Sequence, residues 1–268
     1  MPLLFQLDDV GFRYEGISAL RGLSLQIAEG ESIALLGANG SGKSTLLRLL
    51  DALCFPTEGS LTFAGQRFTT ELFHQDGFSH SFRRRVALVF QNPDVQLFNP
   101  TVFDEVAFGP LQLQWPKEQV RSRVMAALEL MKIEHLCDRP PYRLSGGEKK
   151  RVALASVIVV EPEVLLLDEP TAALDPRSQS QIIDLIQDWK SSSKTVITAT
   201  NQLEIVGDIA SRIVVLEDGR VAASGTPAEI LSNQELLLRA NLVHAHRHSH
   251  GSYEHSHPHI HSHARHEH

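Results

Sequence analysis

The segment Gly37-Ala38-Asn39-Gly40-Ser41-Gly42-Lys43-Ser44 constrains this chain most, because it matches the pattern GxxxxGK[ST]. It follows an apolar run at 31–36 that predicts a strand, and it precedes a leucine-rich segment at 46–50 that predicts a helix. The backbone N–H groups of such a loop surround phosphate oxygens, and the helix N-terminus adds a favourable dipole. Lys43 is expected to contact the β- and γ-phosphates of a nucleotide, and the Ser44 hydroxyl to ligate Mg²⁺.

A second site feature is an apolar strand that ends in two carboxylates. Val164 to Leu167 predict a buried strand, and Asp168 and Glu169 follow it. Charge at the end of such a strand usually marks a site. We expect Asp168 to hold Mg²⁺ and Glu169 to polarise the water that attacks the nucleotide.

Composition and charge exclude several classes of protein. The net charge is −7, which argues against a nucleic-acid binder. Cys54 and Cys137 form no CxxC pair, which fits a reducing compartment. The longest apolar candidate, 152–160, is far shorter than a membrane span, and the first ten residues lack the pattern of a signal peptide. We therefore expect any work at a membrane to depend on a partner.

Along the chain, strand-like and helix-like segments alternate. Short alternating runs at 3–29 and apolar runs at 86–90 and 196–198 predict strands, and apolar spacing at 117–132 predicts an amphipathic helix. Such alternation favours an α/β fold with a parallel sheet covered on both faces. The helix-rich segment 91–160 is expected to be an insertion into this core.

Leu144-Ser145-Gly146-Gly147-Glu148 precedes a predicted helix, and Ser145 is a good N-cap. Ser145 stands 23 residues before Asp168. With the phosphate loop and the carboxylates, this string resembles the signature motif of ATP-binding-cassette (ABC) ATPases. The resemblance covers about residues 3–235. It implies a P-loop NTPase fold with a RecA-like parallel-sheet core, an antiparallel β subdomain and a helical subdomain.

The resemblance also implies roles for individual residues. Tyr14 is similar to the aromatic that stacks on adenine, and Gln91 to the glutamine that touches Mg²⁺ and reports the nucleotide state to a membrane partner. Asp175 belongs to a segment similar to the loop that crosses a dimer interface. The signature residues would contact the γ-phosphate held by a second subunit. The expected nucleotide-binding residues are Tyr14, Gly37, Asn39, Gly40, Ser41, Gly42, Lys43, Ser44, Thr45, Ser145, Gly146, Gly147 and Asp175. The expected Mg²⁺ ligands are Ser44, Gln91 and Asp168.

Two further runs narrow the resemblance. Residues 90–98 (FQNPDVQLF) and 101–110 (TVFDEVAFGP) look like the A component of energy-coupling-factor (ECF) importers of prokaryotes. That likeness implies an ATPase dimer, with a homodimer expected, at the cytoplasmic face of the cell membrane. The dimer would drive a transmembrane T component and a substrate-binding S component that import vitamins or Ni²⁺/Co²⁺.

Asn201 departs from the family pattern. The family usually has a histidine after the strand at 196–198, and Asn201 stands at that position. An amide can donate a hydrogen bond but cannot become cationic. We expect Asn201 to keep a weakened contact near the γ-phosphate and count it, with Glu169 and Gln91, among the candidate catalytic residues.

The composition changes at residue 244, where the expected ATPase domain (1–243) gives way to a tail (244–268). The tail contains eleven histidines among 25 residues, at His244, His246, His248, His250, His255, His257, His259, His261, His263, His266 and His268. Few apolar residues accompany them, so we expect a disordered tail. Imidazole is a good ligand for Ni²⁺, Co²⁺ and Zn²⁺. The tail therefore predicts metal binding and favours a metal cargo, slightly nickel.

Three alternatives stay open. The same ATPase could serve a vitamin importer, with the tail as a metal buffer. A soluble ABC ATPase in DNA repair or translation would usually carry a long coiled-coil insertion or tandem cassettes, and the sequence has neither. A metal-storage protein with a vestigial ATPase is the third, and turnover of MgATP distinguishes it.

Overall fold

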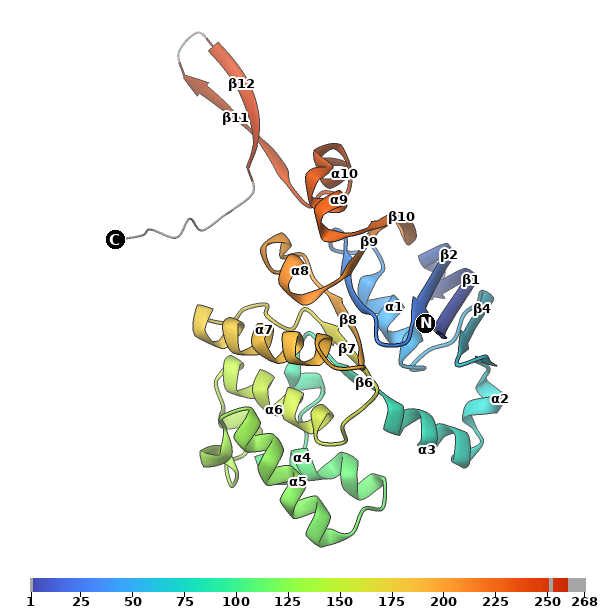
Figure 1. Cartoon of the computed structure of the whole chain (residues 1–268), viewed down its shortest axis with the longest axis vertical. Helices are drawn as coiled ribbons and strands as arrows, with labels where there is room; N and C mark the ends of the chain where they lie inside the picture. The colour runs from blue at the N-terminus through green and yellow to red at the C-terminus, as the bar shows by residue number, and fades with distance from the viewer. Residues whose placement is uncertain (1, 251–252, 260–268) are drawn as a thin grey trace.

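The structure is a computed structural model that describes the backbone of residues 2–250 and 253–259 and the side chains of residues 2–243 (Figure 1). Strands and helices alternate along most of it. The strands are β1 (Leu3–Tyr14), β2 (Ile17–Ala28), β3 (Ser32–Leu36), β4 (Glu58–Phe63), β5 (Gln66–Arg67), β6 (Val86–Val89), β7 (Val164–Asp168), β8 (Thr195–Ala199), β9 (Arg212–Glu217), β10 (Arg220–Gly225), β11 (His244–His250) and β12 (Tyr253–His259). The α-helices are α1 (Lys43–Leu50), α2 (Thr70–Phe73), α3 (Asp76–Arg85), α4 (Val102–Gln112), α5 (Lys117–Leu130), α6 (Gly146–Ile158), α7 (Pro176–Lys190), α8 (Leu203–Ile209), α9 (Pro227–Ser232) and α10 (Gln234–Arg239). Three 3₁₀ turns lie at Pro93–Val95, Glu134–Leu136 and Pro141–Arg143.

The core is a six-stranded sheet with the strand order β10-β9-β3-β8-β7-β6. All neighbours pair in parallel except β10, which runs antiparallel to β9. Every residue of β3, β7 and β8 is buried, as expected for parallel strands covered on both faces. The carboxyl ends of these strands meet at one edge of the sheet, where loops from distant parts of the sequence come together.

The two faces of this sheet pack against different layers. Ala34 and Leu36 face a core built from the helices α4 to α8. Ile33 and Leu35, which alternate with them, face a core built from α1 and the strands β1, β2 and β4. The alternation of β3 therefore places the loop that follows it between two packed layers.

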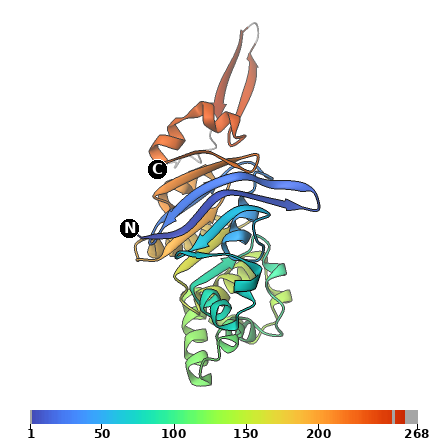
Figure 2. The ribbon, with the colours of Figure 1, turned by 90° about the vertical axis from the view of Figure 1, so that its right-hand side faces the viewer.

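The second layer is an antiparallel sheet with the strand order β2-β1-β4-β5. Figure 2 shows the long strands β1 and β2 crossing in front of the central sheet. Glu15 and Gly16 connect them with φ angles of 42° and 90°. Two consecutive residues in the left-handed region match a type I′ turn, the turn that suits the right-handed twist of a hairpin.

Helices α4, α5 and α6 lie between β6 and β7 in the sequence. They form the end of the molecule opposite to α9 and α10 (Figures 1 and 2). Ser145 is the N-cap of α6 and forms a capping box with Glu148. The Ser145 hydroxyl oxygen accepts from the Glu148 N–H, and the Glu148 carboxylate accepts from the Ser145 N–H. The parallel core, the antiparallel sheet and this helical part confirm the predicted fold class. Within the described residues, none of the helices is both long and apolar enough to cross a membrane.

The described part of the tail has a regular backbone. β11 and β12 pair antiparallel, with His244 opposite His259, His246 opposite His257 and His248 opposite His255. Residues that alternate with a period of two are compatible with an extended strand. The ribbon joins neither of the two larger sheets. A two-stranded ribbon alone is marginally stable in water, so it adds little to the stability of the ATPase domain.

Candidate nucleotide-binding site

The loop between β3 and α1 has a backbone that only glycine accommodates at its two ends. Gly37 and Gly42 have φ angles of 153° and 107°. A Cβ atom on Gly37 would lie 2.4 Å from the Leu216 carbonyl oxygen, and one on Gly42 would lie 2.7 Å from Leu20 Cδ2. Gly42 also caps α1 without a side-chain hydrogen bond from the described residues. The first N–H groups of α1 are therefore available to an anion.

Lys43 is almost completely buried beneath this loop. Only 7% of its surface is exposed, and its ammonium donates to the Gly37 and Ala38 carbonyls at 2.6 and 3.2 Å and to Asn201 Oδ1 at 2.8 Å. Burial lowers the pKa of Lys43, whereas the nearby Glu169 and Asp168 carboxylates raise it. The ammonium is thus held at the phosphate loop by acceptors from two distant segments.

Asn201 connects the loop after β8 with the phosphate loop. Its Oδ1 accepts from Lys43, and its Nδ2 donates to Asn39 Oδ1 at 2.9 Å. The sequence predicted a contact at the γ-phosphate. That contact stays a prediction; among the described side chains, the Asn201 amide oxygen accepts from Lys43 and its nitrogen donates to Asn39, both in the phosphate loop.

The two carboxylates at the end of β7 have different surroundings. Asp168 is 8% exposed, and its Oδ1 has no hydrogen-bond partner among the described residues. A buried, unpaired carboxylate oxygen is costly, and a bound cation would relieve that cost. The orphaned oxygen therefore fits a Mg²⁺ ligand.

Glu169 lies one residue further in a strained backbone conformation, with a φ angle of 46°. Its N–H donates to the Ala199 carbonyl at 2.9 Å, and its carboxylate accepts from the Thr200 hydroxyl at 3.3 Å. Burial raises the pKa of Glu169, and the Lys43 ammonium opposes that shift. A raised pKa makes a carboxylate a better proton acceptor near neutral pH.

A cavity of ≈ 450 Å³ brings the predicted residues together. It extends from the phosphate loop to the carboxylates, and Gln91, which follows β6, also borders it. Its lining consists of Ile17, Ser18, Ala19, Asn39, Gly40, Gly42, Lys43, Ser44, Thr45, Gln91, Asp168 and Glu169. Basic and N–H groups on one side and carboxylates on the other fit a phosphate chain with its Mg²⁺.

Several residues that border this cavity or support it were not predicted from the sequence. Ile17, Ser18 and Ala19 belong to the start of β2 and line one wall. Tyr14, predicted to stack on adenine, lies outside this lining within the described structure, opposite Ile17 in the hairpin, and its hydroxyl accepts from Arg48 at 3.3 Å. Ile17 is 75% exposed, and an exposed apolar residue beside a turn was the signal that could have indicated that this end of β2 borders a cavity.

The signature residues do not border the cavity within this one chain. Ser145 and Gly146 lie at the start of α6, and a Cβ on Gly146 would meet no described atom within 4 Å. Asp175 caps α7 by accepting from the Ser178 N–H at 3.0 Å. Ser145 and Gly146 are exposed, whereas the Asp175 carboxylate is already hydrogen-bonded to Ser178, and none of the three lines the cavity in the described chain.

Lys150 was also missed. It is 2% exposed, and its ammonium donates to the Gln91 carbonyl at 2.8 Å and to the Phe90 carbonyl at 3.2 Å. Burial lowers the pKa of Lys150 to about 8. The Asp168 and Glu169 carboxylates have the opposite, smaller effect on this pKa, because they favour the charged ammonium. Nothing in the local pattern of α6 distinguishes this lysine from its half-buried neighbours Lys149 and Arg151.

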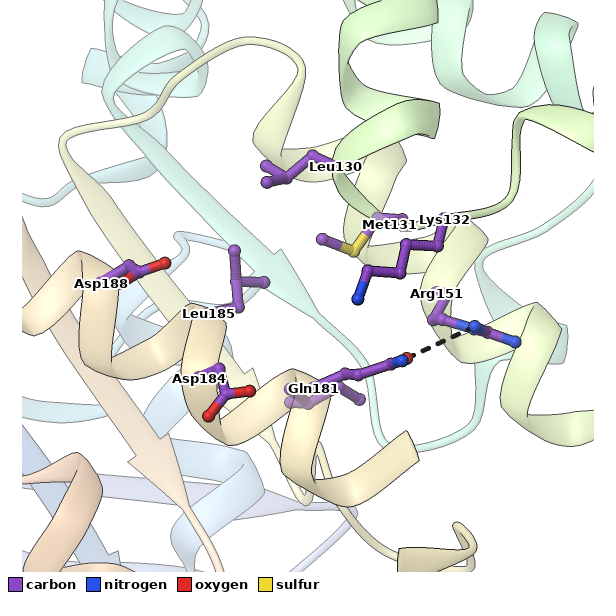
Figure 3. A pocket seen from close by; sticks show the side chains of 9 residues that line it. Leu130, Met131, Lys132, Arg151, Gln181, Asp184, Leu185 and Asp188 are labelled. Carbon is purple, nitrogen blue, oxygen red and sulfur yellow. Dashed lines mark hydrogen bonds between the residues drawn. The ribbon is translucent and has the colours of Figure 1, made fainter. Parts of the chain in front are cut away.

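A smaller hollow of ≈ 140 Å³ lies between α5, α6 and α7 (Figure 3). Leu130 and Met131 border it from one side, and Leu185 and Asp188 from the other. None of the phosphate-loop residues lines it, so it is a gap between packed helices and not the nucleotide site.

The predicted metal-binding histidines of the tail lie outside the described side chains. Of these, His261, His263, His266 and His268 lie outside the described backbone as well. In the part of the chain whose side chains are described, no three His, Cys, Asp or Glu residues form a group that could hold a metal ion. Metal binding by the tail therefore stays a prediction.

Comparisons with known proteins agree with this geometry. The family profile described as ABC transporter matches residues 20–172. The nickel import ATP-binding protein NikO of Rhodobacter capsulatus is 54% identical over 91% of this chain and 97% of that protein. The energy-coupling factor transporter ATP-binding protein EcfA of Methanocaldococcus jannaschii is 41% identical over 89% of this chain and 85% of that protein.

Solved structures are similar as well. The structure of cbiO1 from Clostridium perfringens, part of the ABC transporter complex cbiONQ, matches with a TM-score of 0.74 and 37% identity over 90% of this chain and 96% of that one. A dimeric ATP-binding cassette in a post-hydrolysis state, bound to ADP and Pi, matches with a TM-score of 0.75 and 28% identity over 84% of this chain and 99% of that one. The predicted family is thus confirmed, and the chain belongs to the ATPases of ABC transporters.

Proposed function

We propose that this ATPase is the ATP-hydrolysing A component of an ECF-type importer and that its cargo is nickel or cobalt. The observation that carries the ATPase role is the cavity in which the phosphate loop faces Asp168 and Glu169. The similarity to a nickel import protein over nearly its whole length, together with the histidine tail, supports the cargo.

The residues around the cavity have distinct tasks in this proposal. Lys43 and the N–H groups at the start of α1 bind the β- and γ-phosphates of ATP. Ser44, Asp168 and Gln91 hold Mg²⁺, which neutralises charge on the phosphate oxygens when it is bound. The wall at Ile17 and the nearby Tyr14 contact the base.

Glu169 acts as the general base. Its carboxylate accepts a proton from a water molecule as the water oxygen attacks the γ-phosphorus, and the bond from that phosphorus to the β–γ bridging oxygen breaks. The products are ADP and inorganic phosphate. The Thr200 hydroxyl, at 3.3 Å, orients the carboxylate, and burial keeps its pKa raised. Asn201 holds Lys43 in place from the opposite side.

A second subunit completes the site. Ser145 and Gly146 are exposed at the start of α6, Gly147 beside them is half-buried, and none of the three borders the cavity in the described chain. Two copies arranged head to tail would place the signature residues of one copy on the γ-phosphate of the other, and the loop at Asp175 across the interface. The similar dimeric cassette supports this arrangement, and a homodimer is the simplest form of it.

The transport role requires membrane partners. We propose transmembrane T and S components that hold the ATPase dimer at the cytoplasmic face of a prokaryotic membrane, with Gln91 reporting the nucleotide state to the T component. The names of two similar proteins, an EcfA and a member of the cbiONQ complex, support this assembly.

The tail is proposed to bind Ni²⁺, Co²⁺ or Zn²⁺. Its histidines recur with a period of two, and the backbone register pairs three of them across the ribbon. Neutral imidazole is a preferred ligand of these ions, and nickel binds more tightly than cobalt in the Irving–Williams order.

The test is expression of this chain with its membrane partners in cells, followed by uptake of radioactive nickel and of vitamins. Nickel or cobalt uptake that requires ATP and an intact Lys43 is the expected result. Vitamin uptake without metal uptake would assign the same ATPase to a vitamin importer. ATP hydrolysis without co-purifying membrane proteins would contradict the transport role.

A further inference from the structure

Three consecutive residues of α6 are basic: Lys149, Lys150 and Arg151. Of these three, Lys150 is buried and the other two are half-buried. Lys149 forms an exposed ion pair with Asp94 at 2.7 Å. Lys150 has no carboxylate partner within ion-pair distance in the described residues, and both of its hydrogen bonds go to the Phe90 and Gln91 carbonyls. A buried ammonium costs free energy unless it is well hydrogen-bonded. Such a cost is retained where the charge fixes a particular arrangement of the backbone.

The segment that Lys150 holds contains Gln91, and a second contact ties it to the same helix. Gln96 Oε1 accepts from the Phe90 N–H at 3.3 Å, and Gln96 Nε2 donates to the Ala153 carbonyl at 2.9 Å and the Ser156 hydroxyl at 3.1 Å. The backbone at Phe90 is therefore held from both its N–H and its carbonyl. These hydrogen bonds attach the Gln91 segment to α6.

The opposite side of α6 is packed less tightly. Arg151 Nη1 reaches Gln181 Oε1 only at 3.5 Å, and its Nε has no partner among the described residues. The hollow of ≈ 140 Å³ separates α6 from α7 here, as Figure 3 shows beside the dashed Arg151–Gln181 contact. α6 is hydrogen-bonded to the Gln91 segment, but it packs only loosely against α7. A displacement of α6 is therefore expected to be transmitted toward Gln91.

We propose that Lys150 is the positioning residue that couples the signature helix to Gln91, so that a nucleotide-dependent displacement at Ser145 changes how Gln91 meets Mg²⁺. The proposal rests on the function proposed above for Gln91 and the signature residues. Lys150 is not among the residues that line the cavity, and it acts through the backbone of the segment that it holds.

The test compares Lys150→Met, Lys150→Gln and the control Lys149→Met in the full-length chain. Methionine keeps the length of the side chain and removes its donors, glutamine restores two donors, and Lys149→Met removes only the exposed ion pair. Two quantities are measured: ATP affinity with EDTA present, and the Mg²⁺ concentration that gives half-maximal ATP hydrolysis.

Lys150→Met is expected to bind Mg²⁺-free ATP within about twofold of wild type, because the phosphate loop is unchanged. Its half-saturating Mg²⁺ concentration should rise about tenfold, the effect of ~1.4 kcal/mol, with a lower kcat. Lys150→Gln should recover part of the loss, and Lys149→Met should match wild type, because exposed ion pairs contribute little.

Several outcomes would overturn the proposal. A Lys150→Met variant with the Mg²⁺ dependence of wild type would show that the tie to Gln91 has no role. If Lys150→Met weakened Mg²⁺-free ATP binding by the same factor as it raised the half-saturating Mg²⁺ concentration, Lys150 would have a structural role only. The same conclusion would follow if Lys150→Met failed to fold while Lys150→Gln folded and behaved as wild type. A wild-type chain without Mg²⁺-dependent hydrolysis would instead contradict the proposed function, independently of Lys150.

Discussion

Glu169 is buried, and its φ angle of 46° lies in a region that side chains other than glycine rarely adopt. Strain of this kind persists only where surrounding contacts hold it, here the bond from the Glu169 N–H to the Ala199 carbonyl. The backbone therefore aims the carboxylate into the cavity, and burial raises its pKa. In the proposed role of Glu169 as general base, this position serves catalysis at some cost in stability.

Glu169→Gln is expected to keep tight ATP binding and to lower kcat at least about a hundredfold, because an amide cannot accept the proton that general-base catalysis removes. The variant should accumulate as an ATP-bound dimer on size-exclusion chromatography, while phosphate release falls. Lys43→Ala is the control, since it should lose ATP binding itself. Hydrolysis by Glu169→Gln at the wild-type rate would show that another group is the base.

Asn201→His is expected to hydrolyse ATP at the wild-type rate or faster. Histidine restores the residue usual in the family, and a neutral imidazole can still accept from Lys43 while its second nitrogen donates. Phosphate release at saturating MgATP measures the effect, with Asn201→Ala as the variant that loses both hydrogen bonds. Loss of most activity in Asn201→His would mean that the amide bridge from Lys43 to Asn39 is adapted to this chain.

At the scale of elements, a contact between Asp51 and the half-exposed Arg83 joins the end of α1 to α3. Asp51 follows α1 and is 7% exposed, and Arg83 on α3 approaches its carboxylate at 3.2 Å and its carbonyl oxygen at 2.6 Å. Burial raises the pKa of Asp51 from 3.8 to about 7, although the Arg83 guanidinium lowers it. The folded state therefore retains a proton that the unfolded chain has released between these pH values.

This retained proton gives a pH-dependent prediction. Because the folded state binds more protons between about pH 4 and 7, the wild-type free energy of unfolding should fall as pH rises through that window, by at most about 1.4 kcal/mol per pH unit from Asp51, and level off above 7. Asp51→Asn should lack this contribution. Urea unfolding at pH 5, 6, 7 and 8 measures the difference, with the exposed Asp184→Asn as control. A constant difference between Asp51→Asn and wild type would show that Asp51 does not titrate there.

Some elements could be predicted from local pattern and others could not. The helix at α6 was predicted from its N-cap at Ser145, because a capping residue acts within four residues. α3 was missed because only Phe78 and Phe82 along it are apolar, and Phe82 is buried in an aromatic cluster that includes the distant Phe63. Contacts between residues so far apart in the sequence leave no periodic pattern of apolar residues in a short segment.

At the scale of the whole molecule, the tail can be separated from the ATPase domain. Val243 is the last residue with a described side chain and is 7% exposed, so a chain ending there keeps the core complete. Deletion of residues 244–268 is expected to leave ATP binding, dimerisation and thermal stability unchanged. It should remove most Ni²⁺ binding, since His74, His80 and His135 are the histidines that remain and belong to no metal-binding group among the described side chains.

Isothermal titration of both chains with Ni²⁺ at pH 7.5 and 5.5 checks this prediction. The full-length chain should bind several weak equivalents at pH 7.5 and far fewer at pH 5.5, because free imidazole protonates near pH ~6.5 and then no longer binds metal. Equal nickel uptake by the two chains would refute the metal-binding role of the tail and remove the main sequence argument for a metal cargo.

The sequence by itself determined the family and predicted the chemistry of the phosphate loop and of the carboxylates at the end of β7, because each of these motifs is a short contiguous run whose residue types are specific. The tertiary structure decided which distant residues share the cavity. The order β3-β8-β7-β6 brings Asn201 to Lys43 and places Gln91 beside Asp168, and it leaves Ser145 outside. It also buries Lys150 against the Gln91 carbonyl. Strand order and helix packing are set by the sum of many long-range apolar contacts, which a local pattern of residues does not specify.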